Sequence, residues 1–205
     1  MKINNILAKK QKICYTLYMR KKDNQYEIPS EAKILLLSCC APCSVEVIER
    51  LKKEGHDFSV LFYNPNIFPF EEYQKRLMEN KNLCQKEGVS FIELPWERDI
   101  WCIATQGLEN EPEKGRRCDK CFALRLKKAV DYAKQKGFTH FTSVLGVSRY
   151  KNFEQVTSIA LQIANEADLP YIPINWRKNG GEDRRAFLAK EKNLYHQTYC
   201  GCKPR

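Results

Sequence analysis

A chain of 205 residues can bury roughly 70% of the surface that it exposes when unfolded, so one domain with a single sizeable core is the default expectation. Its 35 lysine and arginine residues against 25 acidic residues give a net charge of +10, which favours a polyanionic partner, nucleic acid first. No apolar run approaches the ~20 residues needed to cross a bilayer, and no secretory signal is evident. These features exclude an integral membrane protein and predict a cytoplasmic one.

The start of the chain differs in composition from the rest. The first 22 residues contain seven lysines and arginines and no acid, so we expect a basic N-terminal arm over residues 1–30. This arm could touch phosphates or simply be solvated. Residues 31–205 are expected to form a single α/β catalytic domain with a cysteine-rich metal site.

Short apolar runs alternate with helical stripes along this domain. The runs predict five strands, over residues 33–38, 58–62, 89–94, 139–145 and 171–174. Apolar residues three and four apart predict helices over residues 44–54, 71–87, 153–167 and 183–192, and another that begins near Cys118 and stops at Gly137. The stretch 96–115 is expected to be a loop with a short helix. The alternation predicts a doubly wound parallel five-stranded sheet, whose ligands sit beyond the carboxyl ends of the strands.

Seven cysteines fall in three short motifs. The first strand ends in Cys39, Cys40 and Cys43, and the remaining four are Cys118, Cys121, Cys200 and Cys202. Thiolates select zinc or iron-sulfur clusters, and four would suffice for either, so seven suggest a second centre. A structural zinc site with spare thiols and a redox disulfide remain alternatives.

Two further expectations concern individual thiols. If strand geometry persists through Cys39 and Cys40, their side chains point to opposite sides and reach two different centres. Cys43 and Cys121 lie near helix N-termini, where the positive end of the helix dipole is expected to lower the pKa of a thiol.

The motifs, taken together, resemble one family. They are Ser38-Cys39-Cys40-Ala41-Pro42-Cys43, then Tyr63-Asn64-Pro65-Asn66-Ile67 with Glu72-Tyr73, then Arg117-Cys118 to Cys121-Phe122 with Arg125-Leu126, and finally Tyr199-Cys200-Gly201-Cys202. This order resembles the cobalamin-independent epoxyqueuosine reductases, over about residues 33–202. The resemblance implies an adenine-nucleotide alpha-hydrolase-like fold of the HUP, Rossmann-like class. It also implies reduction of epoxyqueuosine to queuosine at the wobble position of tRNA.

The same resemblance implies cofactors and ligands. It predicts a 4Fe-4S cluster held by three cysteines and a nearby mononuclear metal, expected to be iron, with an external electron donor that the sequence does not identify. The ligand pool is Cys39, Cys40, Cys43, Cys118, Cys121, Cys200 and Cys202, together with Asp119, the only acid inside a cysteine motif. The cluster is expected to draw its ligands from this pool without Cys43 and Asp119.

Further candidates lie outside the thiols. Tyr63 and Tyr199 are candidate proton donors. Basic residues near the motif ends are candidates for binding tRNA, namely Arg116, Arg117, Lys151, Arg177 and Lys178.

Two competing functions remain open. An ATP-dependent tRNA thiolation enzyme of the same fold would need a glycine-rich phosphate loop after the first strand, where this chain has Cys39-Cys40-Ala41-Pro42. A zinc-stabilised, non-catalytic tRNA-binding protein is the other alternative.

Overall fold

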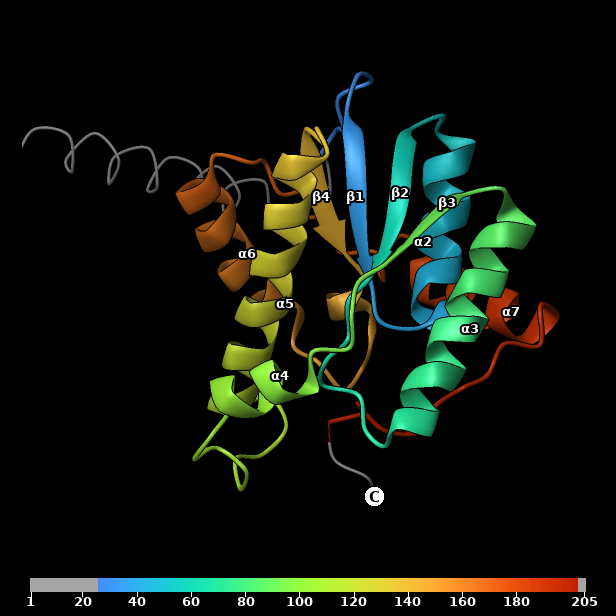
Figure 1. Cartoon of the computed structure of the whole chain (residues 1–205). Coiled ribbons are helices and arrows are strands. Elements are labelled where there is room, and N and C mark those ends of the chain that lie inside the picture. The colour runs from blue at the N-terminus through green and yellow to red at the C-terminus, as the bar shows by residue number, and fades with distance from the viewer. Residues whose placement is uncertain (1–25, 203–205) are drawn as a thin grey trace, which may run out of the picture.

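The computed structural model describes residues 26–202 (Figure 1). Of the predicted basic arm, residues 1–25 lie outside the described part of the chain. The elements are β1 (Lys33–Ser38), α2 (Ala41–Lys53), β2 (Asp57–Phe62), α3 (Phe70–Glu87), β3 (Ser90–Glu93), α4 (Arg98–Ala104), α5 (Arg116–Gln135), β4 (His140–Ser143), a 3-10 helix (Leu145–Val147), α6 (Phe153–Ala167) and α7 (Gly181–Glu191).

The four strands form one parallel sheet in the order β3-β2-β1-β4. β1 lies at its centre, where Leu36 pairs with Val60 of β2 on one side and with Thr142 of β4 on the other. Residues 34–38 of β1 are fully buried. Burial on both faces explains why this strand reads as a continuous apolar run instead of alternating.

Helices cover both faces of the sheet (Figure 1). α2, α3 and α7 lie on one side, and α5 and α6 lie on the other. The chain runs outward from β1 through β2 to β3 and then returns to β4, on the other side of β1. This reversal makes the carboxyl end of β1 the topological switch point, where folds of this class bind their ligands. Residues 39–43 follow β1 at that point.

The predicted fifth strand is reduced to one bridge, so the sheet has four strands. Tyr171 pairs in parallel with Phe141, whose N–H donates to Pro170 O (3.1 Å) and whose carbonyl accepts from Ile172 N (2.9 Å). A continued ladder would pair the carbonyl of Ile172 with the N–H of Ser143, but this carbonyl accepts from Thr142 Oγ1 instead (3.0 Å), so the ladder stops there. The doubly wound parallel architecture is otherwise as predicted.

Helix boundaries agree closely with the expectations, with one useful exception. The helix after β1 begins at Ala41 instead of residue 44, with Pro42 in its first turn, where a missing N–H is harmless. Cys43 therefore lies inside the first turn of α2. Among the residues that the structure describes, no helix has the length and apolar character required to cross a membrane.

Candidate metal centre

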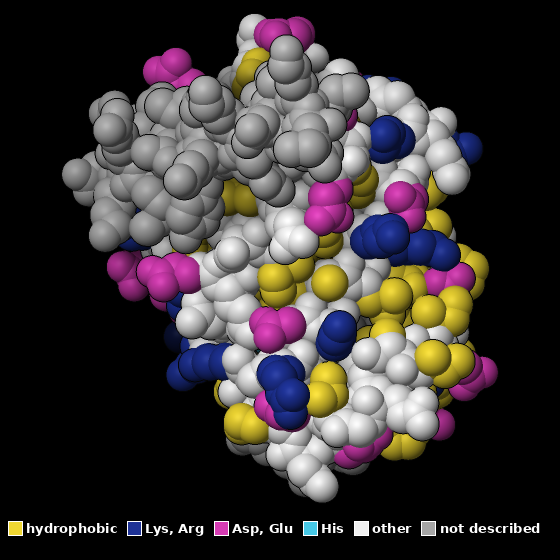
Figure 2. Space-filling view, turned by 90° about the vertical axis from the view of Figure 1, so that its left-hand side faces the viewer, with side chains coloured by type: hydrophobic (Ala, Val, Ile, Leu, Met, Phe, Trp, Pro, Cys, Tyr) yellow, Lys and Arg dark blue, Asp and Glu magenta, His cyan; other side chains and the backbone are white. Residues whose placement is uncertain are grey.

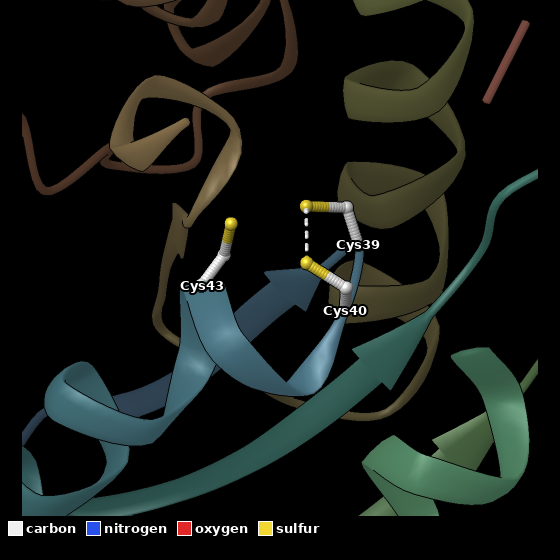
Figure 3. A group of neighbouring side chains, drawn as sticks. All are labelled: Cys39, Cys40 and Cys43. Atoms are coloured by element: carbon white, nitrogen blue, oxygen red, sulfur yellow. Dashed lines mark hydrogen bonds between the residues drawn. The ribbon is translucent and has the colours of Figure 1, made fainter. Parts of the chain in front are cut away.

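Three thiols converge at the carboxyl end of β1. Cys39, Cys40 and Cys43, here called the cysteine triad, are buried, and their sulfur atoms all lie within 4.8 Å of one another. The sulfurs of Cys39 and Cys40 are 3.8 Å apart and lie on the same side of the backbone (Figure 3). The expectation that they point to opposite sides is therefore wrong. β1 ends at Ser38, and Cys40 is already the N-cap of α2, so the strand alternation does not reach them.

Polar side chains hold the turn that carries the triad. Ser44 Oγ donates to the carbonyl of Cys40 (3.0 Å) and lies 2.6 Å from Ser38 Oγ. Asn80 from α3 donates to Ser38 Oγ (2.6 Å), and Asn64 donates to the carbonyl of Ser38 (3.0 Å). Buried hydrogen bonds of this kind fix one geometry, because leaving any of these groups unpaired costs free energy. The turn is a fixed platform for the three sulfurs.

The other four thiols come from α5 and from the C-terminal segment, residues 193–202. Cys118 and Cys121 lie near the start of α5, and Cys118 accepts a hydrogen bond from Lys114 N (3.3 Å). Gln197 of the C-terminal segment donates to the sulfur of Cys40 (2.8 Å) and so joins this segment to the triad. The triad and these four thiols are together called the thiol cluster.

Buried contacts anchor the C-terminal segment. Arg76 from α3 donates to the carbonyls of Cys200 (3.0 Å) and Tyr199 (3.3 Å). The N–H of Phe68 donates to the carbonyl of Gly201 (2.9 Å). Gly201 has φ of +111°, and an added Cβ would lie 3.1 Å from both Arg76 Nη1 and Ile67 Cγ1. Only glycine fits this close approach without strain.

Electrostatics ties the seven thiols into one environment. A hydrogen bond from the Cys202 thiol, together with Lys151 and Arg125, lowers the pKa of Cys200 to about 5. The negative charge of Cys39 acts on Cys200, and that of Cys200 acts on Cys118 and Cys121. Each charge raises the pKa of the thiols on which it acts, so a full set of thiolates needs compensating positive charge.

The prediction for Cys43 and Cys121 is wrong in direction. The Cys43 thiol donates to Cys39 and Cys40, which with burial raises its own pKa, and burial raises the pKa of Cys121. The pKa of Cys39 is lowered instead, because the thiols of Cys40 and Cys43 donate to its sulfur. Hydrogen bonding within the triad and desolvation outweigh helix position here.

Two residues predicted to bind tRNA from the surface are buried beside the thiols. Lys151 is only 6% exposed, and although burial lowers its pKa, the charges of Cys39, Cys200 and Cys43 more than offset this and raise it. Arg117, also buried, donates to the carbonyl of Glu109 (2.8 Å) and to the sulfur of Cys202 (3.7 Å). We correct their assignment: both cations face thiols instead of solvent, since negative sulfur atoms offset the cost of burying positive charge.

Arg125 is a site residue whose role the sequence did not predict. It is fully buried, donates from Nε to the carbonyl of Tyr63 (3.2 Å) and from Nη2 to Asn64 Oδ1, and lowers the pKa of Cys39, Cys121 and Cys200. Its position on the apolar stripe of α5, one residue before Leu126, is the signal that could have identified it as an inward-facing cation.

Three other predicted site residues have partners outside the thiol cluster. Asp119 accepts a hydrogen bond from Gln155 Nε2 (2.6 Å). Tyr63 donates to Glu97 Oε2 (2.6 Å), and Tyr199 donates to the carbonyl of Phe68 (3.2 Å). Within residues 26–202, the triad is the only group of three or more ligand-type side chains close enough to share a metal ion. The role of Asp119 as a metal ligand and the roles of Tyr63 and Tyr199 as proton donors stay predictions.

The remaining basic candidates are more exposed. Arg116 pairs with Glu111 (2.8 Å) at the surface. Arg177 and Lys178 line a hollow together with Val147, Arg149, Asn175 and Glu182. On the face seen in Figure 2, lysines and arginines are interspersed with acids instead of forming a continuous stripe. The hollow therefore brings together two of the residues predicted to bind tRNA, Arg177 and Lys178.

The donor set fits a soft, negatively charged metal group. Three thiols within reach of one ion match the preference of zinc and iron-sulfur centres for sulfur ligands. The indole N–H of Trp101 is buried without a hydrogen-bond partner, and it lowers the pKa of the Cys121 thiol. Arg117 Nε is likewise buried without a partner. Unpaired buried donors beside thiols are what a site built for bound anionic sulfur would leave.

A match to known proteins covers the part of the chain that contains all three cysteine motifs. The family model described as epoxyqueuosine reductase QueH matches residues 34–203. The chain is 45% identical to the epoxyqueuosine reductase QueH of Acinetobacter baylyi, over 90% of this chain and 85% of that protein. It is 45% identical to that of Histophilus somni (83% and 70% covered) and 35% identical to that of Staphylococcus epidermidis (97% and 88%).

Two solved structures share the fold at low sequence identity. The U34-tRNA thiolase NcsA from Methanococcus maripaludis, solved with its [4Fe-4S] cluster, matches with a TM-score of 0.54 and 13% identity, over 98% of this chain and 69% of that one. A predicted subunit of tRNA methyltransferase from Methanocaldococcus jannaschii matches with a TM-score of 0.53 and 11% identity, over 82% and 94%. These likenesses confirm the adenine-nucleotide alpha-hydrolase-like fold.

Proposed function

Because this chain belongs to the epoxyqueuosine reductase QueH family, and is thus an oxidoreductase of queuosine biosynthesis that reduces epoxyqueuosine, we propose that the thiol cluster is its catalytic centre. We further propose that the substrate is epoxyqueuosine at the wobble position of a tRNA anticodon. The observation that carries this proposal is the convergence of the triad at the switch point of the sheet, where this fold class binds its ligands.

The thiol cluster would hold a 4Fe-4S cluster and a second, mononuclear metal, iron in this proposal. The triad offers three sulfur ligands already within reach of one metal ion. The thiols of α5 and the C-terminal segment would draw together as further ligands on metal binding. When bound, such groups supply single electrons and a Lewis acid. Seven thiols exceed what one four-ligand centre uses, which supports two centres over one.

The positive residues of the site would stabilise this concentration of negative charge. Lys151 and Arg125 both act on Cys39 and Cys200, and Arg117 donates to Cys202. Cations held at fixed positions in a buried site stabilise charge without reorganising. They would keep thiolate ligands deprotonated and would favour binding of an anionic centre.

Converting an epoxide to an alkene breaks two C–O bonds, consumes two electrons and two protons, and releases water. Tyr63 and Tyr199 remain our candidates for holding these protons. Burial and the hydrogen bond to Glu97 raise the pKa of Tyr63, so its hydroxyl stays protonated at physiological pH. Lys128 donates to the same carboxylate (2.9 Å) and holds it in place. A proton held on Tyr63 Oη can be replaced through Glu97, which is half-buried at the edge of the site.

Reduction of epoxyqueuosine in tRNA tests the proposal directly. Anaerobically purified protein with its iron restored should convert epoxyqueuosine to queuosine in tRNA when supplied with a strong chemical reductant, as read by mass spectrometry of the digested nucleosides. The protein should be brown, and iron should exceed zinc in metal analysis. Iron-loaded protein that leaves the epoxide intact would refute the function, and colourless zinc-loaded protein that remains active would refute the cofactor assignment.

The competing functions gain no support from this site. The turn after β1 contains no glycine and carries Pro42, which has no N–H to offer a nucleotide phosphate. Membership of a reductase family also speaks against a non-catalytic RNA-binding protein.

A further inference from the structure

Two aromatic side chains stand exposed beside the thiol cluster, on the loop between β2 and α3 and at the start of α3. Phe68 is 43% exposed and Phe70 is 41% exposed, although large aromatic residues usually bury most of their surface. Neither aromatic side chain has a part in the site as described so far. We call Phe68, Phe70 and the guanidinium of Arg98 the aromatic ledge.

The ledge is attached to the site on two sides. The N–H of Phe68 donates to Gly201, between Cys200 and Cys202, and its carbonyl accepts from Tyr199. On the other side Arg98 lies over the rings of Phe68 (5.4 Å) and Trp101 (4.4 Å). Trp101 belongs to α4, which packs against α5. A molecule lying on Phe68 would therefore be next to the segment that carries Cys200 and Cys202.

The neighbouring contacts hold the ledge in shape. Phe70 packs against Trp96, with ring centroids 4.7 Å apart, and stacks on Tyr73 at 5.8 Å. The guanidinium of Arg98 donates to the carbonyl of Asn66 (3.0 Å). The ring of Phe70 and the guanidinium of Arg98 are thus held by their neighbours, while both phenylalanines keep about two-fifths of their surface exposed. A rigid flat surface loses little conformational freedom when a planar ligand stacks on it.

We propose that the aromatic ledge binds unpaired nucleobases that flank the target nucleotide in the anticodon loop. This inference rests on the proposed function. Proteins read single-stranded RNA by stacking bases on aromatic rings, and the ledge exposes two such rings. Base stacking needs only exposed ring faces, whereas an interface with a folded protein would need a larger continuous patch. The chain's net charge of +10 also complements a polyanion.

The ledge should be tested through binding, which does not require turnover. We would measure the dissociation constant of metal-loaded protein for an anticodon stem-loop RNA by fluorescence anisotropy. Loss of one stacked base predicts that Phe68→Ala weakens binding about 5- to 150-fold. Phe68→Trp should restore it, since the larger ring still stacks. The slope of log K against log salt should not change, because no phosphate contact is removed.

Phe187→Ala provides the matched control. Phe187 is 56% exposed, and it also lies beside an arginine, with Arg184 5.2 Å from its ring, but it belongs to α7. This variant should bind the stem-loop as the unmodified protein does. A second control is a blunt RNA duplex without a loop, whose binding should be the same for Phe68→Ala and unmodified protein.

Several outcomes would overturn the inference. Unchanged stem-loop binding by a folded Phe68→Ala variant would do so, as would equal weakening by Phe187→Ala or equal weakening toward the duplex. If Phe68→Ala bound the stem-loop normally but lost activity only with a protein electron donor and not with a chemical reductant, the ledge would belong to the donor. In each of these cases epoxyqueuosine reduction by the unmodified protein would still support the proposed function. Absence of that reduction would instead refute the function itself.

Discussion

The cysteine triad and the C-terminal segment reach the same thiol cluster in different ways. The triad follows β1 directly, and buried serine and asparagine side chains hold its turn. The C-terminal segment has no helix or strand beyond residue 191 among the described residues. Separate hydrogen bonds hold it, among them those of Arg76, Gln197, Tyr195 and the N–H of Phe68. Ligands on a short turn fixed between a strand and a helix come preformed, whereas ligands on a longer irregular segment are only as stable as its separate anchors.

The largest effect is expected from removing a thiol of the triad. Cys40→Ser should lower the iron bound per chain and the reductase activity by about 10- to 100-fold or more, because the serine hydroxyl is a poor ligand for a soft metal. Metal analysis and the visible absorption spectrum measure the loss. Cys102→Ala, which removes an exposed cysteine outside the thiol cluster, should retain its iron. Iron content equal to that of Cys102→Ala would show that the triad is not the metal platform.

Removing the main anchor of the C-terminal segment should come next. Arg76 is buried, pairs with Glu72 (2.6 Å) and donates to two carbonyls of the segment. Arg76→Met would remove the cation that pairs with Glu72, leaving only the hydrogen bond from Tyr195 Oη (2.9 Å), and should lower the free energy of unfolding by about 3 to 5 kcal/mol. In metal-free protein, alkylation mapped by mass spectrometry should accelerate at Cys200 and Cys202 before it does at the triad.

An exposed ion pair provides the control for this change. Arg184→Met breaks the pair with Glu49, in which both side chains are well exposed, and should cost no more than about 1 kcal/mol. If the two variants lost similar stability, or if alkylation of the triad accelerated equally in Arg76→Met, the segment and the triad would be one cooperative unit.

A smaller effect is expected where the C-terminal segment approaches α3 most closely. Gly201→Ala would place a methyl group against Arg76 and Ile67 at a positive φ, and should cost about 1 to 3 kcal/mol in free energy of unfolding. Gly55→Ala also has positive φ (+76°) but meets nothing within 4 Å, so it isolates the backbone strain. Urea unfolding of both variants gives the difference. Equal losses would mean that the close approach contributes nothing.

The smallest effect concerns the ion pairs that Glu87, at the end of α3, makes with lysines at the ends of α2 and α7. Glu87 accepts hydrogen bonds from Lys52 of α2 and from Lys192 (both 2.9 Å), and these lysines lower its pKa. A lowered folded pKa stabilises the protein at pH above the unfolded value of about 4.3, and this contribution disappears as pH falls through the folded pKa. Glu87→Gln should therefore cost up to about 1 kcal/mol at neutral pH and nothing in acid. Urea unfolding at both pH values tests this, and a cost that persisted in acid would contradict it.

The sequence predicted the helices and strands whose pattern of apolar residues matches the surface that they bury. The apolar run of residues 33–38 and the stripe of residues 153–167 coincide with β1 and α6. The three cysteine motifs also meet, because parallel strands and the loops after them share one edge. By contrast, the opposite directions expected of Cys39 and Cys40 required strand geometry to continue past Ser38, where β1 ends. α2 begins at Ala41, before its predicted start at residue 44, so the chain already turns at these cysteines.

Charge was the other source of error. Lys151 and Arg117 are candidates for binding tRNA because they are basic and lie near the motifs. Their burial depends on thiols supplied by distant parts of the chain, Cys39 and Cys200 for Lys151 and Cys202 for Arg117. Such compensation is a property of the assembled site, so it cannot be predicted from the residues flanking each cation.

The single bridge that replaces the fifth strand bears on how copies of this protein behave at high concentration. A strand at the margin of a sheet exposes backbone groups on which another molecule can add a strand, and aggregation can start there. Here Phe141 of β4 already exchanges both backbone hydrogen bonds with residues 170–172. Ile172 directs its N–H at β4, so the nitrogen of the next residue, Pro173, faces the outer margin and has no N–H to offer a further strand. This proline therefore protects the margin from pairing with other molecules.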